Sequence, residues 1–559
     1  MSTESAPAAT PAEHPPAAGY DFEGAALELG GLMSGPAALT GERVRIPLAM
    51  VNRHGLVAGA TGTGKTKTLQ LLAEQLSAAG VPVFAADIKG DLSGLATPGE
   101  GGEKLLARTA SLGQQWTPTA HPVEYYALGG QGTGIPVRVT VSAFGPLLLS
   151  RILGLNDTQE SSLGLVFHYA DAAGLPLLDL ADLRAVVQHL ASKEGKADLA
   201  QLGGLSSSTA GVILRELIAF ADAGAEAFFG EPEFDSADLL ALAPDGRGVI
   251  SLVELPELQT RPAVFSTFLM WLLADLFHDL PEVGDVDKPK LVFFFDEAHL
   301  LFKGASTAFL EQIAQTVRLI RSKGVGVFFV TQSPTDVPDE VLAQLGSRVQ
   351  HQLRAHTPND AKALRATVDT YPTSTYPDLG EVLTTLGIGE AVVTVMDERG
   401  APTPVAWTRL RAPQSLMAPS TPESMAAVVA ASPRAARYTQ VVDRESAREL
   451  LAARLEGGAA AAAEEQDPPA PAAPQAPAAG PVGTVEVRRP PMQGSGGAAA
   501  PQAPAKKTTA PKKQGAAQGS GAGEVVKDVL SSSPVKQFLR TAAAEVARGM
   551  FGTARRRRR

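Results

Sequence analysis

The chain contains no cysteine, which excludes a disulfide framework and any cysteine-based zinc or redox site. Residues 1–24 have neither a basic segment nor an apolar one, so we expect no secretory signal there. The longest apolar run, Phe265–Ala274, is too short to span a bilayer, and Asp275 and His278 follow it. His299 has no further ligands at zinc spacing. We therefore expect a cytoplasmic protein with no zinc.

Charge is distributed unevenly along the chain. Residues 501–559 hold 13 Lys or Arg and 3 Asp or Glu, a formal charge of +10. Because the whole chain carries −10, residues 1–500 carry −20. Such an acidic body is not typical of a general nucleic-acid-binding domain, although it is compatible with a ring whose basic charge is confined to its pore.

One stretch matches the phosphate-binding pattern G-x-x-x-x-G-K-[ST]. It consists of Gly59, Ala60, Thr61, Gly62, Thr63, Gly64, Lys65 and Thr66. Residues 55–58 before it are apolar, as in a buried strand, and residues 66–77 after it show helical periodicity. Backbone N–H groups of such a loop and the helix dipole bind phosphates. We expect Lys65 to reach the β- and γ-phosphates of ATP and Thr66 to ligate Mg²⁺, and we include Thr68 in the ATP-binding set.

A second stretch has the pattern of a Walker B strand. Leu291–Phe295 comprises five apolar residues, and the acids Asp296 and Glu297 follow directly. We expect Asp296 to hold Mg²⁺, directly or through water, and Glu297 to orient and deprotonate the attacking water. The alternative is a buried strand with a solvated acidic end, which by itself is unremarkable.

Two further strands end in polar residues. Residues 81–87 predict a parallel strand, and the segment 88–91 after it lies either at the ligand-binding edge of the sheet or in an ordinary turn. Residues 325–330 predict a strand that leads to Gln332. Gln332 is a candidate γ-phosphate sensor, with simple loop capping as the alternative.

The expected fold class is α/β, a mainly parallel sheet flanked by helices. We predict an ATPase domain over residues 25–415, with a mainly helical insertion at about 100–245. The other predicted segments are a disordered N-terminus (1–24), C-terminal helices (416–456), an Ala/Pro-rich disordered linker (457–523) and a basic amphipathic helix (524–559). The last segment is either a membrane or protein docking helix or a solvated tail.

Taken together, three stretches resemble the HerA/FtsK superfamily of P-loop ATPases: residues 59–66, 293–302 and 317–332. The chain is most similar to a bacterial HerA-like family of unknown function, the helicase HerA-like C-terminal domain family. Further matching stretches are residues 145–151, 229–232 and 345–351. The resemblance covers roughly residues 25–415.

This resemblance implies a RecA-like core with Glu297 as the catalytic residue next to Asp296. It also implies a homo-hexameric ring with ATP between subunits and an arginine supplied in trans. Arg348 and Arg354 lie where the superfamily carries such arginines, and Arg318 and Arg321 are the fallback candidates. Better-known HerA proteins begin with a small β-barrel, for which too few residues precede the P-loop here. That departure leaves the usual nuclease partnership open.

The sequence therefore predicts an ATP-hydrolysing ring motor, a DNA translocase or helicase. The alternative is an ATPase that acts on protein partners at a membrane surface, without nucleic acid. We do not favour an ordinary DEAH-box helicase, because a long insertion separates the P-loop from Asp296 and the paired-arginine motif of those helicases is absent. A small-molecule kinase is disfavoured because a Glu beside the Walker B Asp favours water as the nucleophile.

Overall fold

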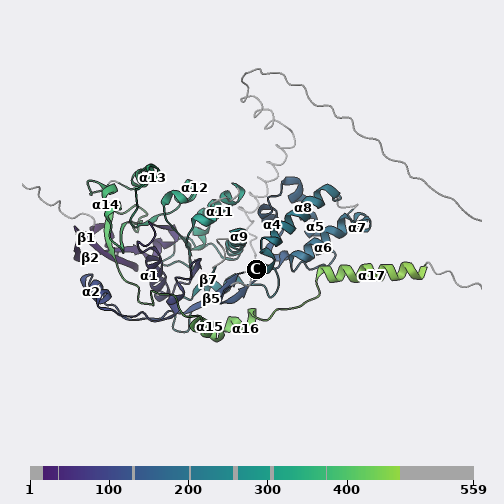
Figure 1. Ribbon diagram of the computed structural model, residues 1–559, viewed down its shortest axis with the longest axis horizontal. Helices are drawn as coiled ribbons and strands as arrows, with labels where there is room; N and C mark the ends of the chain where they lie inside the picture. The colour runs from purple at the N-terminus through teal and green to yellow at the C-terminus, as the bar shows by residue number, and fades with distance from the viewer. Residues whose placement is uncertain are drawn as a thin grey trace, which may run out of the picture. The chain divides into compact units, whose positions relative to one another are not determined.

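The computed structural model describes residues 17–35, 37–128, 132–199, 203–255, 262–302, 307–372 and 374–465 (Figure 1). The predicted linker beyond residue 465 and the basic segment 524–559 lie outside these residues, as do residues 1–16. Of the helices within them, none combines the length and the apolar character that crossing a membrane requires.

A single sheet of 12 strands organises this part of the chain, in the order β2-β1-β12-β11-β10-β3-β9-β8-β4-β7-β5-β6. The strands are β1 (Ala26–Ser34), β2 (Ala37–Pro47), β3 (Gly55–Ala58), β4 (Val83–Asp87), β5 (Val123–Leu128), β6 (Ile135–Val137), β7 (Ile250–Glu254), β8 (Leu291–Phe295), β9 (Val325–Thr331), β10 (Ser347–Gln350), β11 (Glu390–Thr394) and β12 (Ala406–Leu410). All pairs from β10 to β6 are parallel, and those from β2 to β10 are antiparallel. The predicted α/β class with a mainly parallel sheet is confirmed.

Helices flank this sheet. They are α1 (Lys65–Ala78), α2 (Glu103–Ser111), α3 (Val141–Phe144), α4 (Pro146–Ile152), α5 (Asp157–Ala172), α6 (Leu180–Ala191), α7 (Lys193–Asp198), α8 (Ser207–Asp222), α9 (Pro262–Asp279), α10 (His299–Phe302), α11 (Thr307–Ile320), α12 (Asp339–Leu342), α13 (Pro358–Val368), α14 (Leu379–Thr385), α15 (Pro422–Ala431), α16 (Pro433–Tyr438) and α17 (Ala447–Glu465). Within the predicted insertion, α4–α8 pack on one another, whereas β5 and β6 extend the main sheet.

The central strands are buried on both faces, as parallel strands between helix layers must be. Successive side chains of β8 alternate between two cores because the strand has a period of two. Phe293 and Phe295 pack in the core that contains the apolar residues of α9 and α11. Phe294 packs with Leu69 and Leu72 of α1 on the other face. The apolar residues of β8 therefore contribute side chains to the cores on both faces of the sheet.

Three boundaries differ from the sequence-based expectation. The apolar pattern of residues 137–141 predicts a strand, but β6 ends at Val137, because the Thr140 side chain accepts a hydrogen bond from Ala143 N and begins α3 instead. The C-terminal helices were predicted to end by residue 456, but α17 continues to Glu465, so residues 457–465 of the predicted linker are helical. Strand β1 was not predicted, because adjacent glycines within it mask the strand pattern.

The prediction of a disordered N-terminus over residues 1–24 is wrong for residues 17–24. Tyr20, within the segment predicted to be disordered, is fully buried. Its hydroxyl donates to the carbonyl oxygens of Val393 (2.9 Å) and Pro404 (2.6 Å). Residues 17–24 therefore belong to the folded part, because a buried tyrosine with a satisfied hydroxyl anchors them to β11 and its following loop.

Candidate functional site

The P-loop joins β3 to α1 in a conformation that requires glycine. Gly59 has φ 152° and Gly64 has φ 115°, both in the region that other residues rarely adopt. A Cβ on Gly59 would lie 2.5 Å from the Cβ of His351. The loop is fastened to the neighbouring strands as well, since Gly59 N donates to Thr331 O (3.2 Å) and Ala60 N to Gln352 O (2.8 Å). Hydrogen bonds from the backbone of the loop thus fix its position in the structure.

Lys65 begins α1 and is buried, with 8 % of its surface exposed. Its ammonium group donates to the carbonyl oxygens of Gly59 (2.7 Å) and Ala60 (3.2 Å). Burial lowers the pKa of Lys65, and the negative charge of Glu297 opposes this shift. The Lys65 ammonium therefore lies inside the loop, facing the acids at the end of β8.

Asp296 has one bonded and one unbonded carboxylate oxygen. Its Oδ1 accepts a hydrogen bond from Glu297 N (2.8 Å). Its Oδ2 is buried and has no hydrogen-bond partner among the described residues. Burial raises the pKa of Asp296 and the charge of Glu297 adds to the shift, while the charges of Lys89 and Lys65 oppose it. An orphaned carboxylate oxygen fits a hard, oxygen-binding cation such as Mg²⁺, and Asp296 with the half-buried Thr66 hydroxyl would hold it.

Glu297 has a strained backbone and a crowded carboxylate. Its φ of 46° is one of two positive values for non-glycine residues in the described part of the chain. Such strain persists only where the surroundings enforce it, and it gathers at functional sites. Lys89 Nζ forms an ion pair with Oε1, and His299 Nδ1 lies 3.2 Å from Oε2, although that contact lacks hydrogen-bond geometry. Burial alone would raise the pKa of Glu297, but the hydrogen bond and charge of Lys89 outweigh burial and lower it.

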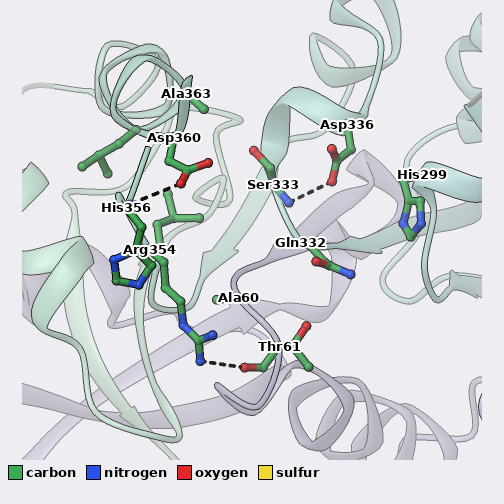
Figure 2. Close-up of a pocket in the computed structure, with 12 residues that line it drawn as sticks. Ala60, Thr61, His299, Gln332, Ser333, Asp336, Arg354, His356, Asp360 and Ala363 are labelled. Atoms are coloured by element: carbon green, nitrogen blue, oxygen red, sulfur yellow. Dashed lines mark hydrogen bonds between the residues drawn. The ribbon is translucent and has the colours of Figure 1, made fainter. Parts of the chain in front are cut away.

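A cleft of about 500 Å³ opens beside the P-loop. It is lined by Ala60, Thr61, His299, Gln332, Ser333, Asp336, Leu353, Arg354, His356, Asp360, Ala363 and Leu364. Figure 2 shows the Gln332 side chain between the P-loop residue Ala60 and His299. Gln332 follows β9, which lies between the P-loop strand β3 and the Walker B strand β8. The predicted sensor is therefore placed between the two motifs.

The predicted arginines lie in different surroundings. Arg354 is exposed and donates through Nη2 to Thr61 O of its own P-loop (3.3 Å; Figure 2). Arg348 is half-buried, and its Nη1 donates to Thr370 Oγ1 (2.7 Å) and O (3.3 Å). Arg318 and Arg321 lie near the end of α11, which leads into the start of β9, at the edge of the sheet opposite the P-loop. Of the four, Arg354 lines the cleft of its own chain.

The hydroxyl groups of Thr63 and Thr68 form hydrogen bonds that stabilise the P-loop. The Thr68 hydroxyl is buried, 2.8 Å from His351 Nε2 and 3.3 Å from Gly64 O. The Thr63 hydroxyl donates to Ala60 O (2.8 Å). The structure thus places the Thr68 side chain against His351 beneath the loop, although Thr68 was predicted to contact ATP. In this position the Thr68 hydroxyl supports the loop, and its predicted contact with ATP stays a prediction.

Sequence reasoning did not assign Lys89 or His351 to the site. Lys89 belongs to the polar segment 88–91, for which an edge-of-sheet role was one of two interpretations. Its pairing with Glu297 spans 208 positions, so no local pattern signals it. His351 lies in the stretch 345–351, which resembles the HerA-like family. That resemblance was the sequence feature that could have pointed to His351.

Comparison with known proteins gives one family and several distant structures. The family described as helicase HerA-like C-terminal matches residues 35–559. The plasmid coupling protein TrwB, solved with ADP and Mg²⁺, is 17 % identical, with 72 % of this chain and 98 % of TrwB aligned at a TM-score of 0.46. VirB4 of Thermoanaerobacter pseudethanolicus is 15 % identical over 72 % of this chain and 99 % of its own, at 0.44. Among curated proteins, none matches significantly.

Proposed function

The chain belongs to the helicase HerA-like C-terminal family, and from this premise we propose that it is an ATP-hydrolysing ring motor that translocates along DNA. The coarser part follows from the family itself: this is an ATP-binding P-loop NTPase of the HerA type. The finer part, namely a homo-hexamer that moves DNA, is our proposal. We assign the ATPase activity to residues 25–415, including the insertion at about 100–245.

One observation supports hydrolysis above all others. The order β3-β9-β8 brings the P-loop, Gln332 and the pair Asp296–Glu297 to the carboxyl ends of three adjacent parallel strands. A nucleotide bound at that edge would have Lys65 on one side and Glu297 on the other. Ala298 N donates to Val330 O (2.8 Å), so the Walker B turn is fastened to the strand that carries Gln332.

Each residue has a separate task in this proposal. Lys65 and the loop N–H groups bind the phosphates, and Gln332 contacts the γ-phosphate from the neighbouring strand. Glu297 orients the attacking water and accepts its proton, which is general-base catalysis. Asp296 and Thr66 would hold Mg²⁺, which would supply positive charge to neutralise the phosphate oxygens. Assembly into a ring would bring an arginine from the next subunit, for which Arg348 and Arg354 are the candidates.

The test is the steady-state ATPase rate with and without long double-stranded DNA, at low and physiological salt. We expect DNA to stimulate hydrolysis and the stimulation to weaken steeply as salt rises, because phosphate contacts release counterions. Glu297→Gln is the control for contaminating ATPase. Hydrolysis that neither duplex nor single-stranded DNA changes at low salt contradicts translocation while leaving the ATPase assignment intact.

A second function is favoured by the charge distribution. The body of the chain is acidic, and residues 524–559 combine an apolar periodicity with five terminal arginines. These features support an ATPase that acts on protein partners at an anionic membrane surface, where each arginine adds about 1 kcal/mol of attraction. Co-sedimentation with anionic vesicles should then separate the full chain from a chain ending at residue 523. Equal sedimentation of the two rejects this function.

A further inference from the structure

We propose that Lys89 is a positioning residue that holds the Glu297 carboxylate in a resting geometry and thereby restrains ATP hydrolysis. This inference rests on the proposed function of Glu297 as the residue that activates water. It assigns a control element to the same site, one contributed by a different strand from those that carry the P-loop, the sensor and the Walker B acids.

The first observation is the crowding of the Glu297 carboxylate. The side chain is 6 % exposed. Lys89 Nζ is bonded to Oε1, and His299 Nδ1 lies 3.2 Å from Oε2. A general base must present an oxygen lone pair to water at hydrogen-bond distance. Lys89 therefore fixes the orientation of the carboxylate through Oε1, whereas Oε2 has no hydrogen-bond partner among the described residues, so the carboxylate can accept a water proton only in the orientation that the ion pair imposes.

The second observation is the direction from which Lys89 approaches. Lys89 follows β4, which pairs with β8 through Ala86 and Phe295. In the sheet, β4 lies on one side of β8, whereas β9 and the P-loop strand lie on the other. The ion pair therefore attaches Glu297 to the flank of β8 that is farther from the P-loop. Release of Lys89 would free the carboxylate to turn towards the nucleotide.

The third observation is that the Lys89 side chain can move while its backbone stays in place. Asp87 accepts hydrogen bonds from Asp91 N (3.2 Å) and Leu92 N (2.8 Å), and Ser93 Oγ donates to Gly90 O (2.9 Å). These bonds fix the turn that carries Lys89. The Lys89 side chain itself is 38 % exposed, so its ammonium group can leave Glu297 for solvent without unfolding the turn.

Stability alone does not account for this ion pair. The Glu297 carboxylate is 6 % exposed, so its ion pair with Lys89 mainly offsets the cost of burying that charge and adds little net stability. Meanwhile the Glu297 backbone is held at φ 46°, which is unfavourable for a residue with a side chain. An ion pair that mainly offsets burial, on a residue with a strained backbone, is suited to switching between contacts.

The experiment compares Lys89→Ala and Lys89→Arg with wild type, using basal kcat and KM for ATP without DNA. Lys89→Ala is expected to raise kcat about two- to fivefold, the range that such an ion pair contributes, and to leave KM unchanged. Lys89→Arg keeps a cation at this position and should stay closer to wild type. Lys288→Ala is the matched lysine control. Lys288 Nζ donates to the carbonyl oxygens of Ala79 and Gly80, which precede β4 at the amino ends of the strands, whereas Lys89 follows β4 at the carboxyl ends.

The double variant Lys89→Ala/Glu297→Gln shows whether the effect acts through Glu297. It should be as inactive as Glu297→Gln alone. Binding of a fluorescent ATP analogue and thermal unfolding, measured on each variant, show that the proteins are folded and bind nucleotide. A rise in kcat that survives in the double variant overturns the inference, because it would come from elsewhere.

Two other results also overturn it. A fall in kcat after Lys89→Ala means that Lys89 assists the reaction, for example by contacting phosphate. An unchanged kcat with a lower melting temperature means that the pair is structural. These failures differ from failure of the proposed function. If wild type shows no ATP hydrolysis that Lys65→Ala removes, the ATPase assignment fails and this inference falls with it.

Discussion

The two halves of the nucleotide site are held in place by different means. On the P-loop half, backbone groups hold the functional side chain, since the Lys65 ammonium donates hydrogen bonds to the carbonyl oxygens of Gly59 and Ala60. On the acidic half, the Glu297 carboxylate is held by the side chain of Lys89. A backbone cradle has one geometry, whereas a side-chain ion pair can be exchanged. The P-loop half is therefore fixed, whereas the acidic half is adjustable.

The largest expected effect separates the two halves by function. Glu297→Gln keeps the shape of the side chain but removes the base, so kcat should fall about 10²- to 10⁴-fold while ATP still binds. Lys65→Ala should instead weaken ATP binding itself, by about 10- to 100-fold, because it removes a charged hydrogen-bond donor. Turnover assays and equilibrium binding of a fluorescent ATP analogue measure both.

Glu254→Gln is the matched control for Glu297→Gln. Glu254 ends β7, which β4 separates from β8 in the sheet, and it is half-buried and accepts a hydrogen bond from Thr133 N (3.4 Å). The change removes the same charge at the same edge of the sheet and should leave turnover near wild type. Normal turnover in Glu297→Gln would remove Glu297 from the catalytic role and, with it, the distinction between the halves.

An intermediate effect is expected from adding a methyl group to the tightly packed backbone of the P-loop. Gly59→Ala puts a Cβ 2.5 Å from the Cβ of His351, at a φ of 152°. We expect a loss of about 1–3 kcal/mol in the free energy of unfolding, typical of overpacking, together with weaker nucleotide binding. Chemical denaturation and ATP titration measure the two losses.

The matched control is Gly62→Ala, at the tip of the same loop. Gly62 also has a positive φ, 83°, but a Cβ there meets no atom within 4 Å. Its cost should be limited to backbone strain of about 1–2 kcal/mol and should be the smaller of the two. Equal losses would mean that strain alone, rather than the contact with His351, limits the loop to glycine.

The smallest expected effect concerns pH. Burial lowers the pKa of His351 to about 3 from 6.5, and the charge of Lys65 adds to the shift. Below pH 6.5 the unfolded chain therefore binds a proton that the folded chain does not, so stability falls as pH drops towards 3. Between pH 7 and 5 this histidine accounts for at most about 2 kcal/mol of the loss.

His351→Asn should reduce the slope of unfolding free energy against pH over that range. His168→Asn, on the exposed part of α5, is the comparison variant and should keep the slope of wild type. An identical slope in His351→Asn and wild type would show that the histidine beneath the P-loop does not titrate with unfolding, and that the cradle is not coupled to pH through it.

Local patterns predicted much of the binding half. Strand β3, the loop and α1 are continuous in sequence, so their spacing alone identified Lys65 and Thr66. The Walker B strand was predicted for the same reason, since five apolar residues and two acids suffice. The supporting position of Thr68 was not predictable, because its partner His351 lies 283 positions away.

The sequence by itself determined the family, the parallel α/β class and the identity of the phosphate-binding and acidic motifs, because each of these is written in contiguous residues. Only the tertiary structure decided which strands lie side by side and which side chains therefore meet. The Lys89–Glu297 pair spans 208 positions and the Arg354–Thr61 bond 293. Strand order in a sheet depends on long-range packing of both faces, and no local periodicity encodes it.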